Sequence, residues 1–204
     1  MLYLSSAYLA PIGYYALLQQ QGGACIEQWD HYVKQTYRNR CIIASPSGPL
    51  VLSIPVEKPA TSKTPMRDIR ISEHGNWRRM HWNALEAAYN SSPFFEYYKD
   101  DFLPFYERPQ GFLVDFNESL CRLVCELIPL RVELSRTTHY RVELEKEDID
   151  GRTLFDAKKT DNRYLTAKPY YQVFEQQLGF LPNLSIVDLL FNMGPESRMV
   201  LLNR

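Results

Sequence analysis

The sequence has no excess of charge of either sign. Lysine and arginine together number 23, aspartate and glutamate 24, and the formal net charge over 204 residues is −1. A protein that coats nucleic acid or an anionic membrane through its overall electrostatic field needs a strongly basic surface, which disfavours both classes. We therefore expect no DNA partner, and any site that binds an anion must be built locally.

Long hydrophobic runs are also missing. No stretch approaches the roughly 20 consecutive apolar residues that a membrane-spanning helix requires. The apolar start of the chain, MLYLSSAYLAPIGYYALL, lacks the basic segment of a signal peptide. We expect a cytoplasmic protein without membrane insertion, in which the four cysteines stay reduced. The spacing of Cys121 and Cys125 on a predicted helix favours core packing over a redox or metal pair.

Common catalytic motifs are absent as well. The chain has no Walker A loop, no GxGxxG fingerprint, no GxSxG elbow and no HExxH motif. These absences remove the most frequent sequence signatures of nucleotide-binding proteins, hydrolases and zinc proteases. The four histidines show no ligand spacing among themselves, so we predict no metal site. The sequence names no cofactor.

What the sequence does contain is the pattern of a single α/β domain over residues 1–204. Apolar residues make up 45% of the chain, enough for a substantial core. Residues 1–27 predict a β-α-β unit, in which Pro11 begins the helix and Gly22-Gly23 ends it. Such a unit tends to place ligands at the carboxyl ends of its strands.

A β-hairpin is predicted after this unit. Two strand-like runs, 41–43 and 50–54, flank the turn signal Pro46-Ser47-Gly48-Pro49. Residues 57–66 are polar, contain proline and have no apolar period, so they predict an exposed loop before the strand-like Ile69 and Ile71.

The middle and the C-terminal part are predicted to be helical. Apolar residues from Trp77 to Tyr89 keep helical spacing, and Pro93 ends that pattern. In the last helix Ser185 is the expected N-cap, with Asp188 as the acidic residue three positions on. Further predicted elements are helices over 94–106, 118–128 and 186–192, a strand-like segment over 131–144 and a solvated acidic run over 145–150.

The segment DHYVKQTYRNR, residues 30–40, combines cationic and aromatic side chains. Lys34, Arg38 and Arg40 alternate with Tyr32 and Tyr37, which brings point charge, forked donors and stacking faces together. Recognition of phosphate or carboxylate needs these groups. The alternative on spacing alone is a solvated edge strand protected by its charges.

His81 borders the apolar face of its predicted helix, four residues from both Trp77 and Leu85. A hydrogen-bonded structural histidine is the more common outcome at such a position. A catalytic base is the alternative, because imidazole is the side chain most easily poised near neutral pH.

Four segments together resemble the WbqC-like family, small bacterial proteins associated with surface-polysaccharide (O-antigen type) biosynthesis. The segments are YLAPIGYYALL, HYVKQTYRNR with the following LSIPV, WRRMHWNALEAAYNSSPFFEYY and FLPNLSIVDLLFNMGPES. The resemblance spans nearly the whole chain. The positions that match the family pattern are Pro11, Gly13, Tyr14, Lys34, Asn39, Arg40, Pro55, Val56, His81, Tyr89, Ser185 and Asp188.

The resemblance implies a cytoplasmic transferase that acts on an activated sugar or acyl donor. In this hypothesis Lys34 and Arg40 hold the phosphate or carboxylate of a small anionic ligand, such as a sugar nucleotide. Asn39 orients that ligand, and His81 acts as general base. The further predicted binding residues are Tyr14, Tyr37 and Arg38.

Two other functions remain open on the sequence. The first is a non-catalytic interaction or assembly protein, in which the aromatic residues between Tyr89 and Tyr106 form a partner-binding surface. The second is local RNA binding by basic and aromatic residues, although the chain has neither a recognised module nor a basic isoelectric point.

Overall fold

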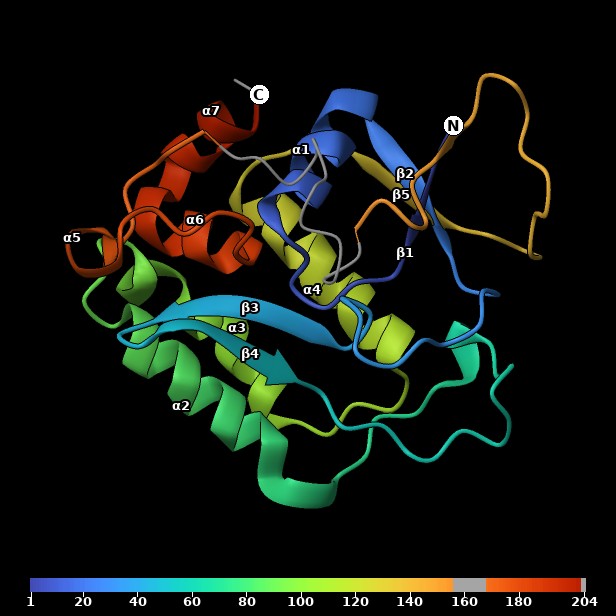
Figure 1. The fold of residues 1–204 in the computed structure, drawn as a ribbon, viewed down its shortest axis with the longest axis horizontal. Helices are drawn as coiled ribbons and strands as arrows, with labels where there is room; N and C mark the ends of the chain where they lie inside the picture. The colour runs from blue at the N-terminus through green and yellow to red at the C-terminus, as the bar shows by residue number, and fades with distance from the viewer. Residues whose placement is uncertain (156–167, 203–204) are drawn as a thin grey trace.

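A parallel sheet begins at the N-terminus (Figure 1). In the computed structural model, which describes residues 1–155 and 168–202, strand β1 (Leu2–Ser5) pairs in parallel with β2 (Gly23–Glu27). Helix α1 (Ile12–Gln21) connects them and ends at Gly22, whose φ of 72° lies in the left-handed region that favours glycine. The predicted β-α-β unit is therefore confirmed.

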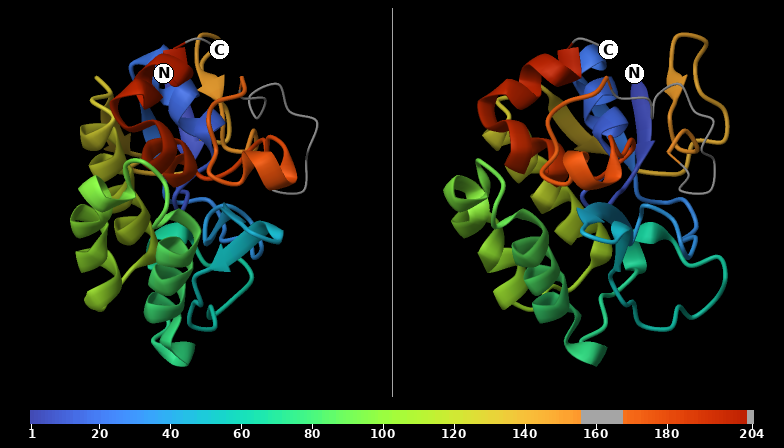
Figure 2. Two further views of the ribbon diagram at one scale, coloured as in Figure 1. Left: turned by 90° about the vertical axis from the view of Figure 1, so that its left-hand side faces the viewer. Right: turned by 60° about the vertical axis from the view of Figure 1, so that its left-hand side comes forward.

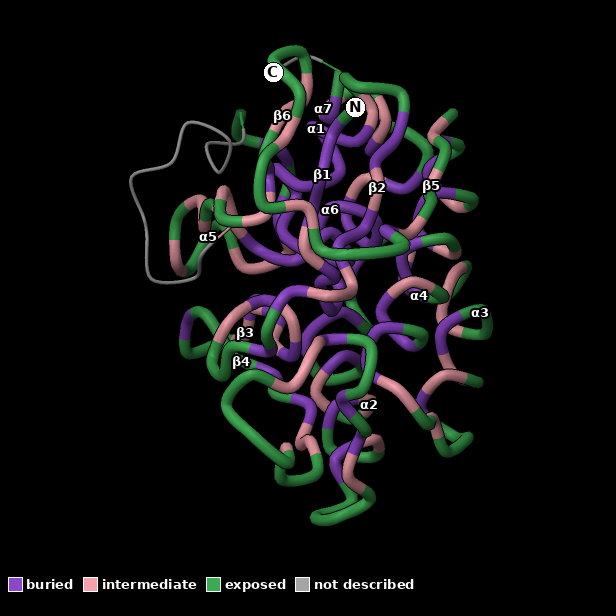
Figure 3. Tube along the Cα trace, turned by 90° about the vertical axis from the view of Figure 1, so that its right-hand side faces the viewer, coloured by how far each residue is buried: buried purple, intermediate pink, exposed green. Residues whose placement is uncertain are grey.

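Two later strands extend this sheet on opposite sides. Strand β5 (Glu133–Arg136) pairs with β2, and the short β6 (Ile149–Asp150) pairs with β1, both in parallel. Figure 3 shows the resulting order β5-β2-β1-β6. The chain thus proceeds outward from β1 in one direction and then returns to its other side. This reversal makes the β1–β6 boundary a topological switch point, where open parallel sheets tend to bind ligands.

The predicted hairpin is confirmed by β3 (Arg40–Ser45) and β4 (Gly48–Ser53), which are antiparallel with Arg40 opposite Ser53. The predicted strand at Ile69 and Ile71 is wrong, since these residues make only isolated bridges and loop hydrogen bonds. The exposed loop predicted over 57–66 is confirmed for residues 57–65, whereas Met66 is buried and begins a 3-10 turn.

Helices pack around the parallel sheet and the hairpin (Figure 2). Helix α2 (Trp77–Tyr89) packs against α3 (Phe95–Glu107), and α1 packs against α6 (Ile186–Met193) and α7 (Ser197–Leu202). The helix predicted over 118–128 begins earlier, at Leu113, and the long strand predicted over 131–144 shrinks to β5. The other helices are α4 (Leu113–Leu127) and α5 (Glu175–Leu178). The 3-10 turns are η1 (Met66–Asp68), η2 (His74–Asn76) and η3 (Gly194–Glu196).

Aromatic side chains from α2, α3 and α6 build much of the core. The Phe191 ring of α6 makes edge contacts with Tyr89, Phe95 and Phe102, at centroid distances of 5.1–5.4 Å. All four are almost fully buried. Burying one such side chain stabilises a fold by about 1.5–3 kcal/mol. The aromatic-rich segment therefore holds the helices together.

The α/β fold class is confirmed. Within residues 1–155 and 168–202, no helix has the length and apolar character needed to span a bilayer. The predicted single domain also includes residues 156–167 and 203–204, which lie outside the described residues. Its extent over the whole chain stays a prediction.

Candidate functional site

The carboxyl ends of the four parallel strands carry a connected row of polar side chains. Thr137, just after β5, donates from Oγ1 to Oε1 of Glu27, the last residue of β2, at 2.8 Å. The other oxygen of Glu27, Oε2, lies 3.7 Å from Nη1 of Arg152, which follows β6. Ser5, the last residue of β1, donates from Oγ to the backbone carbonyl of Arg152 at 2.9 Å. The row thus crosses the whole sheet.

The cationic segment joins this row through one ion pair. Arg38 is paired with Asp30, and their side chains are only 14% and 11% exposed. The Arg38 guanidinium also donates from Nη2 to Oγ of Ser5 at 2.9 Å. Asn117 of α4 fixes the backbone here, since its amide donates to the Arg38 carbonyl at 2.8 Å. We call Ser5, Glu27, Asp30, Arg38 and Arg152 the edge cluster.

A small pocket opens beside the edge cluster at the topological switch point. Its free volume is about 10 Å³, room for about one water molecule. Gly151 is required in its wall, because a Cβ there would lie 2.8 Å from the Tyr3 carbonyl oxygen and 2.5 Å from Leu4 Cδ2. The lining residues are Ser5, Ser6 and Ala7 after β1, Gly151, Arg152 and Phe155 after β6, and Tyr14, Tyr37 and Arg38.

Three polar atoms of the edge cluster are buried and lack a hydrogen-bond partner among the described residues. They are Nε of Arg38, Oδ1 of Asp30 and Oε2 of Glu27. A buried polar atom without a partner costs about 1–3 kcal/mol, and more when the group is charged. Atoms of this kind cluster where a protein binds a ligand or carries out chemistry.

Tyr14 supplies a neutral donor at the same pocket. Its hydroxyl donates to the Ser5 carbonyl at 3.2 Å. Burial raises the pKa of Tyr14 well above its usual value, so the hydroxyl keeps its proton at neutral pH. The pocket therefore combines guanidinium groups and hydroxyls, and the carboxylates of Asp30 and Glu27 lie next to it, paired with Arg38 and Arg152.

The structure brings only part of the predicted binding set together. Tyr14, Tyr37 and Arg38 all line the pocket. Lys34 is exposed on a turn, and neither it nor Arg40, which begins β3, is among the lining residues. Their predicted roles are neither supported nor tested by this geometry.

Asn39 and the backbone of the cationic segment have structural roles. The amide of Asn39 donates from Nδ2 to the Ile54 carbonyl at 2.9 Å, which ties the segment to the end of the hairpin. Turns make up most of residues 34–39, and Gln35 has a positive φ of 61°. The edge-strand alternative is wrong, because these turns replace an extended backbone.

His81 lies in the core. Its Nδ1 is 3.0 Å from the Tyr8 hydroxyl, which is also hydrogen bonded to Tyr106, and its ring packs against Trp77. Burial lowers the pKa of His81 to about 4, while a hydrogen bond to the backbone of Ser53 acts in the opposite direction. The imidazole is therefore neutral at pH 7. It does not line the pocket, and its predicted role as general base stays a prediction.

A second polar cluster surrounds Asp188 on α6. Its carboxylate is fully buried and accepts hydrogen bonds from the Tyr89 hydroxyl at 2.9 Å, from the Gln172 amide at 3.0 Å and from the Tyr170 hydroxyl. Burial raises the pKa of Asp188 to about 6, against the effect of these hydrogen bonds. We call these four residues the Asp188 cluster.

The capping prediction for α6 is only half right. Ser185 is the N-cap, since its hydroxyl accepts from the Val187 amide at 3.4 Å. It also donates to the Leu9 carbonyl at 2.7 Å. Asp188 does not complete a capping box, because its side chain instead binds Tyr89, Tyr170 and Gln172 in the interior.

Sequence reasoning missed most of the edge cluster. The local patterns select neither Ser5, Glu27 nor Arg152, and Asp30 enters only as the first residue of the segment 30–40. Each is inconspicuous locally. The available signal was their position, because Ser5 and Glu27 are the last residues of two strands of a predicted β-α-β unit, where ligands tend to bind.

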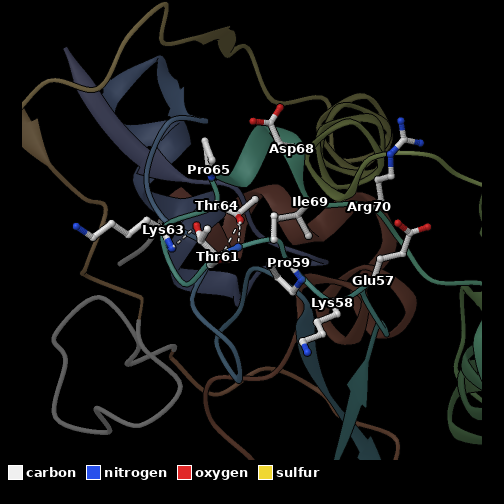
Figure 4. Close-up of a pocket in the computed structure, with 11 residues that line it drawn as sticks. Glu57, Lys58, Pro59, Thr61, Lys63, Thr64, Pro65, Asp68, Ile69 and Arg70 are labelled. Atoms are coloured by element: carbon white, nitrogen blue, oxygen red, sulfur yellow. Dashed lines mark hydrogen bonds between the residues drawn. The ribbon is translucent and has the colours of Figure 1, made fainter.

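The largest of the pockets described has a different character. Figure 4 shows the residues that line this cavity of about 390 Å³ at the loop 57–65, with the side chain of Lys63 extending to the left of the view and that of Lys58 downward. Thr64 donates from Oγ1 to the Thr61 carbonyl at 2.9 Å, so its hydroxyl is used within the loop. Most lining side chains are exposed. This pocket lacks the buried charges that distinguish the edge cluster.

Ligands for a metal ion do not gather in the described ranges 1–155 and 168–202. No group of three or more histidine, cysteine, aspartate or glutamate side chains there has a suitable arrangement. Of the four cysteines, which are all free, Cys41, Cys121 and Cys125 are buried.

Comparison with known proteins places the chain in a family. The model of the WbqC-like protein family matches residues 6–153 and 146–200. A protein of Mycobacterium tuberculosis (strain ATCC 25618 / H37Rv), named "Uncharacterized protein Rv1507c", is 25% identical over 217 residues, covering 95% of this chain and 94% of that protein. No solved structure matches. Because the family model covers nearly the full length, the chain belongs to the WbqC-like protein family.

Proposed function

We propose that this protein is a cytoplasmic transferase in surface-polysaccharide biosynthesis, which binds the anionic group of an activated sugar or acyl donor at the edge cluster. The observation that carries the binding part of the proposal is the guanidinium of Arg38. It lies at the switch point of a parallel sheet, is largely shielded from water, and has a buried Nε without a partner among the described residues. The transferase class and the pathway rest on the family resemblance alone.

The surroundings of Arg38 suit a phosphate or carboxylate. A guanidinium presents its donors as a planar fork that matches these anions, and the attraction is stronger where water is excluded. The Tyr14 and Ser5 hydroxyls lie at the same pocket as neutral polar groups, and each now donates to a backbone carbonyl, Tyr14 to Ser5 and Ser5 to Arg152. Arg152 is held by Asp150 and Glu27, so it contributes charge but few free donors.

The pocket must open before it can hold a donor. Its volume of about 10 Å³ is far below the 300–1,000 Å³ that small-molecule sites usually have. An incoming anion would compete with Asp30 for the Arg38 guanidinium, because Asp30 is its present counter-ion. Because both residues of this pair belong to segment 30–39, the exchange would open a space within that segment, between Asp30 and Arg38.

Ligand binding with Arg38 variants tests this proposal. A panel of sugar nucleotides and acyl donors is titrated by calorimetry into the parent protein, Arg38→Ala and Arg38→Lys. We expect Arg38→Ala to weaken binding at least about tenfold, since a charged hydrogen bond contributes about 1.5–3 kcal/mol. Arg38→Lys keeps the charge but loses the fork, so it should recover only part of the affinity.

Arg79→Ala is the matched control, because Arg79 is an exposed arginine on α2 that lines none of the pockets described. Equal affinities for the parent and Arg38→Ala, or no binding of any donor, would refute the proposal. Product analysis of the bound donor with candidate acceptors then tests the transfer step.

The alternative of a partner-binding aromatic surface has little structural support. Tyr89, Phe95, Phe102 and Tyr106 are all buried in the core. Tyr97, which is 78% exposed, is the main aromatic side chain of that segment that faces solvent. A single exposed tyrosine is ordinary on a protein surface and defines no patch.

A further inference from the structure

A third pocket lies at the opposite end of the sheet from the edge cluster. It surrounds the connection between α4 and β5, close to the amino end of β5, and has a volume of about 350 Å³. Three arginines line it: Arg122 from α4, Arg131 from the connection and Arg198 from α7. Because it lies at the amino end of the sheet, a ligand here is separate from one at the edge cluster.

Positive charge dominates this pocket. Glu126 is its one acidic lining residue, against the three arginines. Arg122 is paired with Glu118 at 2.7 Å, but within the described part of the chain neither Arg131 nor Arg198 has an ion pair. In a chain with a net charge of −1, this is a local excess of cationic groups.

The guanidinium of Arg198 lacks a hydrogen-bond acceptor for one of its donors. Its Nε is buried and has no hydrogen-bond partner among residues 1–155 and 168–202. The guanidinium has only donors and stays charged, so an anion is the partner that satisfies it best. A buried charged donor without a partner lowers the stability of the fold.

The rest of the wall accepts an apolar group without repelling an anion. Leu130 and Val132 contribute aliphatic surface beside the arginines. Cys125 also lines the pocket, and a hydrogen bond to Cys121 together with burial raises the pKa of its thiol. The thiol therefore stays neutral at physiological pH and adds no negative charge.

We propose that this pocket binds a phosphorylated small molecule, with Arg131 and Arg198 holding the phosphate and the Leu130–Val132 wall contacting its apolar part. The inference is independent of the donor site, because none of these residues belongs to the edge cluster. Arginine is the side chain best suited to a phosphate, since its fork can donate two parallel hydrogen bonds.

The test follows the arginine side chains directly. Inorganic pyrophosphate is titrated into ¹⁵N-arginine-labelled protein, and the Nε–Hε resonances are recorded by NMR, with the Arg198 signal assigned through Arg198→Lys. We expect the Arg198 signal to shift at millimolar pyrophosphate or below, and equally in the Arg38→Ala background. Arg131→Gln should weaken this binding about tenfold, as for the loss of one charged hydrogen bond. Arg79→Gln, a change at an exposed arginine outside the pocket, should leave it unchanged.

Three outcomes would overturn the proposal. The first is an Arg198 signal that does not move at millimolar pyrophosphate. The second is a shift that disappears in Arg38→Ala, which would assign the binding to the edge cluster. The third is co-sedimentation with phosphatidylglycerol vesicles but no response to pyrophosphate, which would mark a lipid surface instead of a small-molecule site. Arg131 is exposed, so its variant keeps the test valid if Arg198 variants fold poorly.

Discussion

The edge cluster and the Asp188 cluster are built from similar groups but differ in how completely their polar atoms are hydrogen bonded. Each places a carboxylate and several donors away from water. At Asp188 both carboxylate oxygens accept hydrogen bonds, from Tyr89 on one side and from Tyr170 and Gln172 on the other. In the edge cluster a carboxylate oxygen of Asp30 and the Nε of Arg38 have no partner within the described residues.

This difference separates a structural network from a binding site. A fully satisfied buried network stabilises the fold and specifies its packing, and it leaves no group free to recognise anything else. Unsatisfied charged atoms reduce stability, and proteins retain them chiefly at functional sites. Variants of the Asp188 cluster should therefore change stability, and variants of the edge cluster should change binding.

The largest expected effect is on stability at Asp188. Asp188→Ala removes the acceptor for Tyr89, Tyr170 and Gln172 and leaves these donors buried and unpaired. We expect the free energy of unfolding, from urea denaturation, to fall by about 3–5 kcal/mol. Asp100→Ala, at an exposed position on α3, is the control. A loss below about 1 kcal/mol would show that the network contributes little.

The buried histidine gives a pH-dependent test. The pKa of His81 is about 4 in the folded state because of burial and about 6.5 when unfolded, so its contribution to stability is complete above pH 6.5 and is lost toward pH 4. Relative to His81→Gln, the parent should lose about 3 kcal/mol of unfolding free energy between about pH 7 and pH 4. Subtracting the variant cancels Asp188, whose pKa burial raises to about 6 and whose contribution instead declines as pH rises through that value. Parallel pH profiles for the two proteins would contradict a buried neutral imidazole.

A double variant of the edge cluster should change binding far more than stability. Arg38→Met with Asp30→Asn removes both partners of the ion pair, so no unpaired charge remains from it. Replacing a whole buried pair is often nearly neutral, and we expect a change of about 1 kcal/mol or less in unfolding free energy. Affinity for the anionic donor should fall at least about tenfold. A large loss of stability would place this cluster with the structural networks.

The smallest effect is expected at Lys34. Its side chain is exposed and has no ion pair among the described residues, so Lys34→Ala should alter unfolding free energy by about 0.5 kcal/mol or less. Donor affinity, from the same calorimetry, should also stay close to that of the parent. If the affinity falls as far as in Arg38→Ala, the predicted role of Lys34 is correct and the site extends along the segment.

Local patterns were enough to predict much of the fold. The apolar spacing predicted α2, the glycine pair predicted the end of α1, and the turn signal predicted the hairpin. Strand β6 could not be found in this way, because its two residues end an acidic run and become a strand only by pairing with Leu2 and Tyr3. That pairing joins residues that lie far apart in the sequence, so no local pattern can indicate it.

The site was harder to predict for the same reason. The basic segment indicated Arg38, but Ser5, which accepts its hydrogen bond, is the last residue of β1 and carries no local pattern. The same holds for Arg152, which follows β6 and accepts from Ser5 through its backbone carbonyl. Helical spacing placed His81 at the border of an apolar face. It could not show that Tyr8, from another part of the chain, would enclose the ring in the core.

The pairing of β1 with β6 has a consequence for how the chain folds during synthesis. The β1-α1-β2 unit is made first and can pair from local contacts alone, whereas one edge of β1 stays open until Ile149 and Asp150 have been made. An open strand edge invites pairing with other chains. The last event at this edge is also the one that brings Gly151 and Arg152 to Ser5, so the donor pocket is assembled only when the sheet closes.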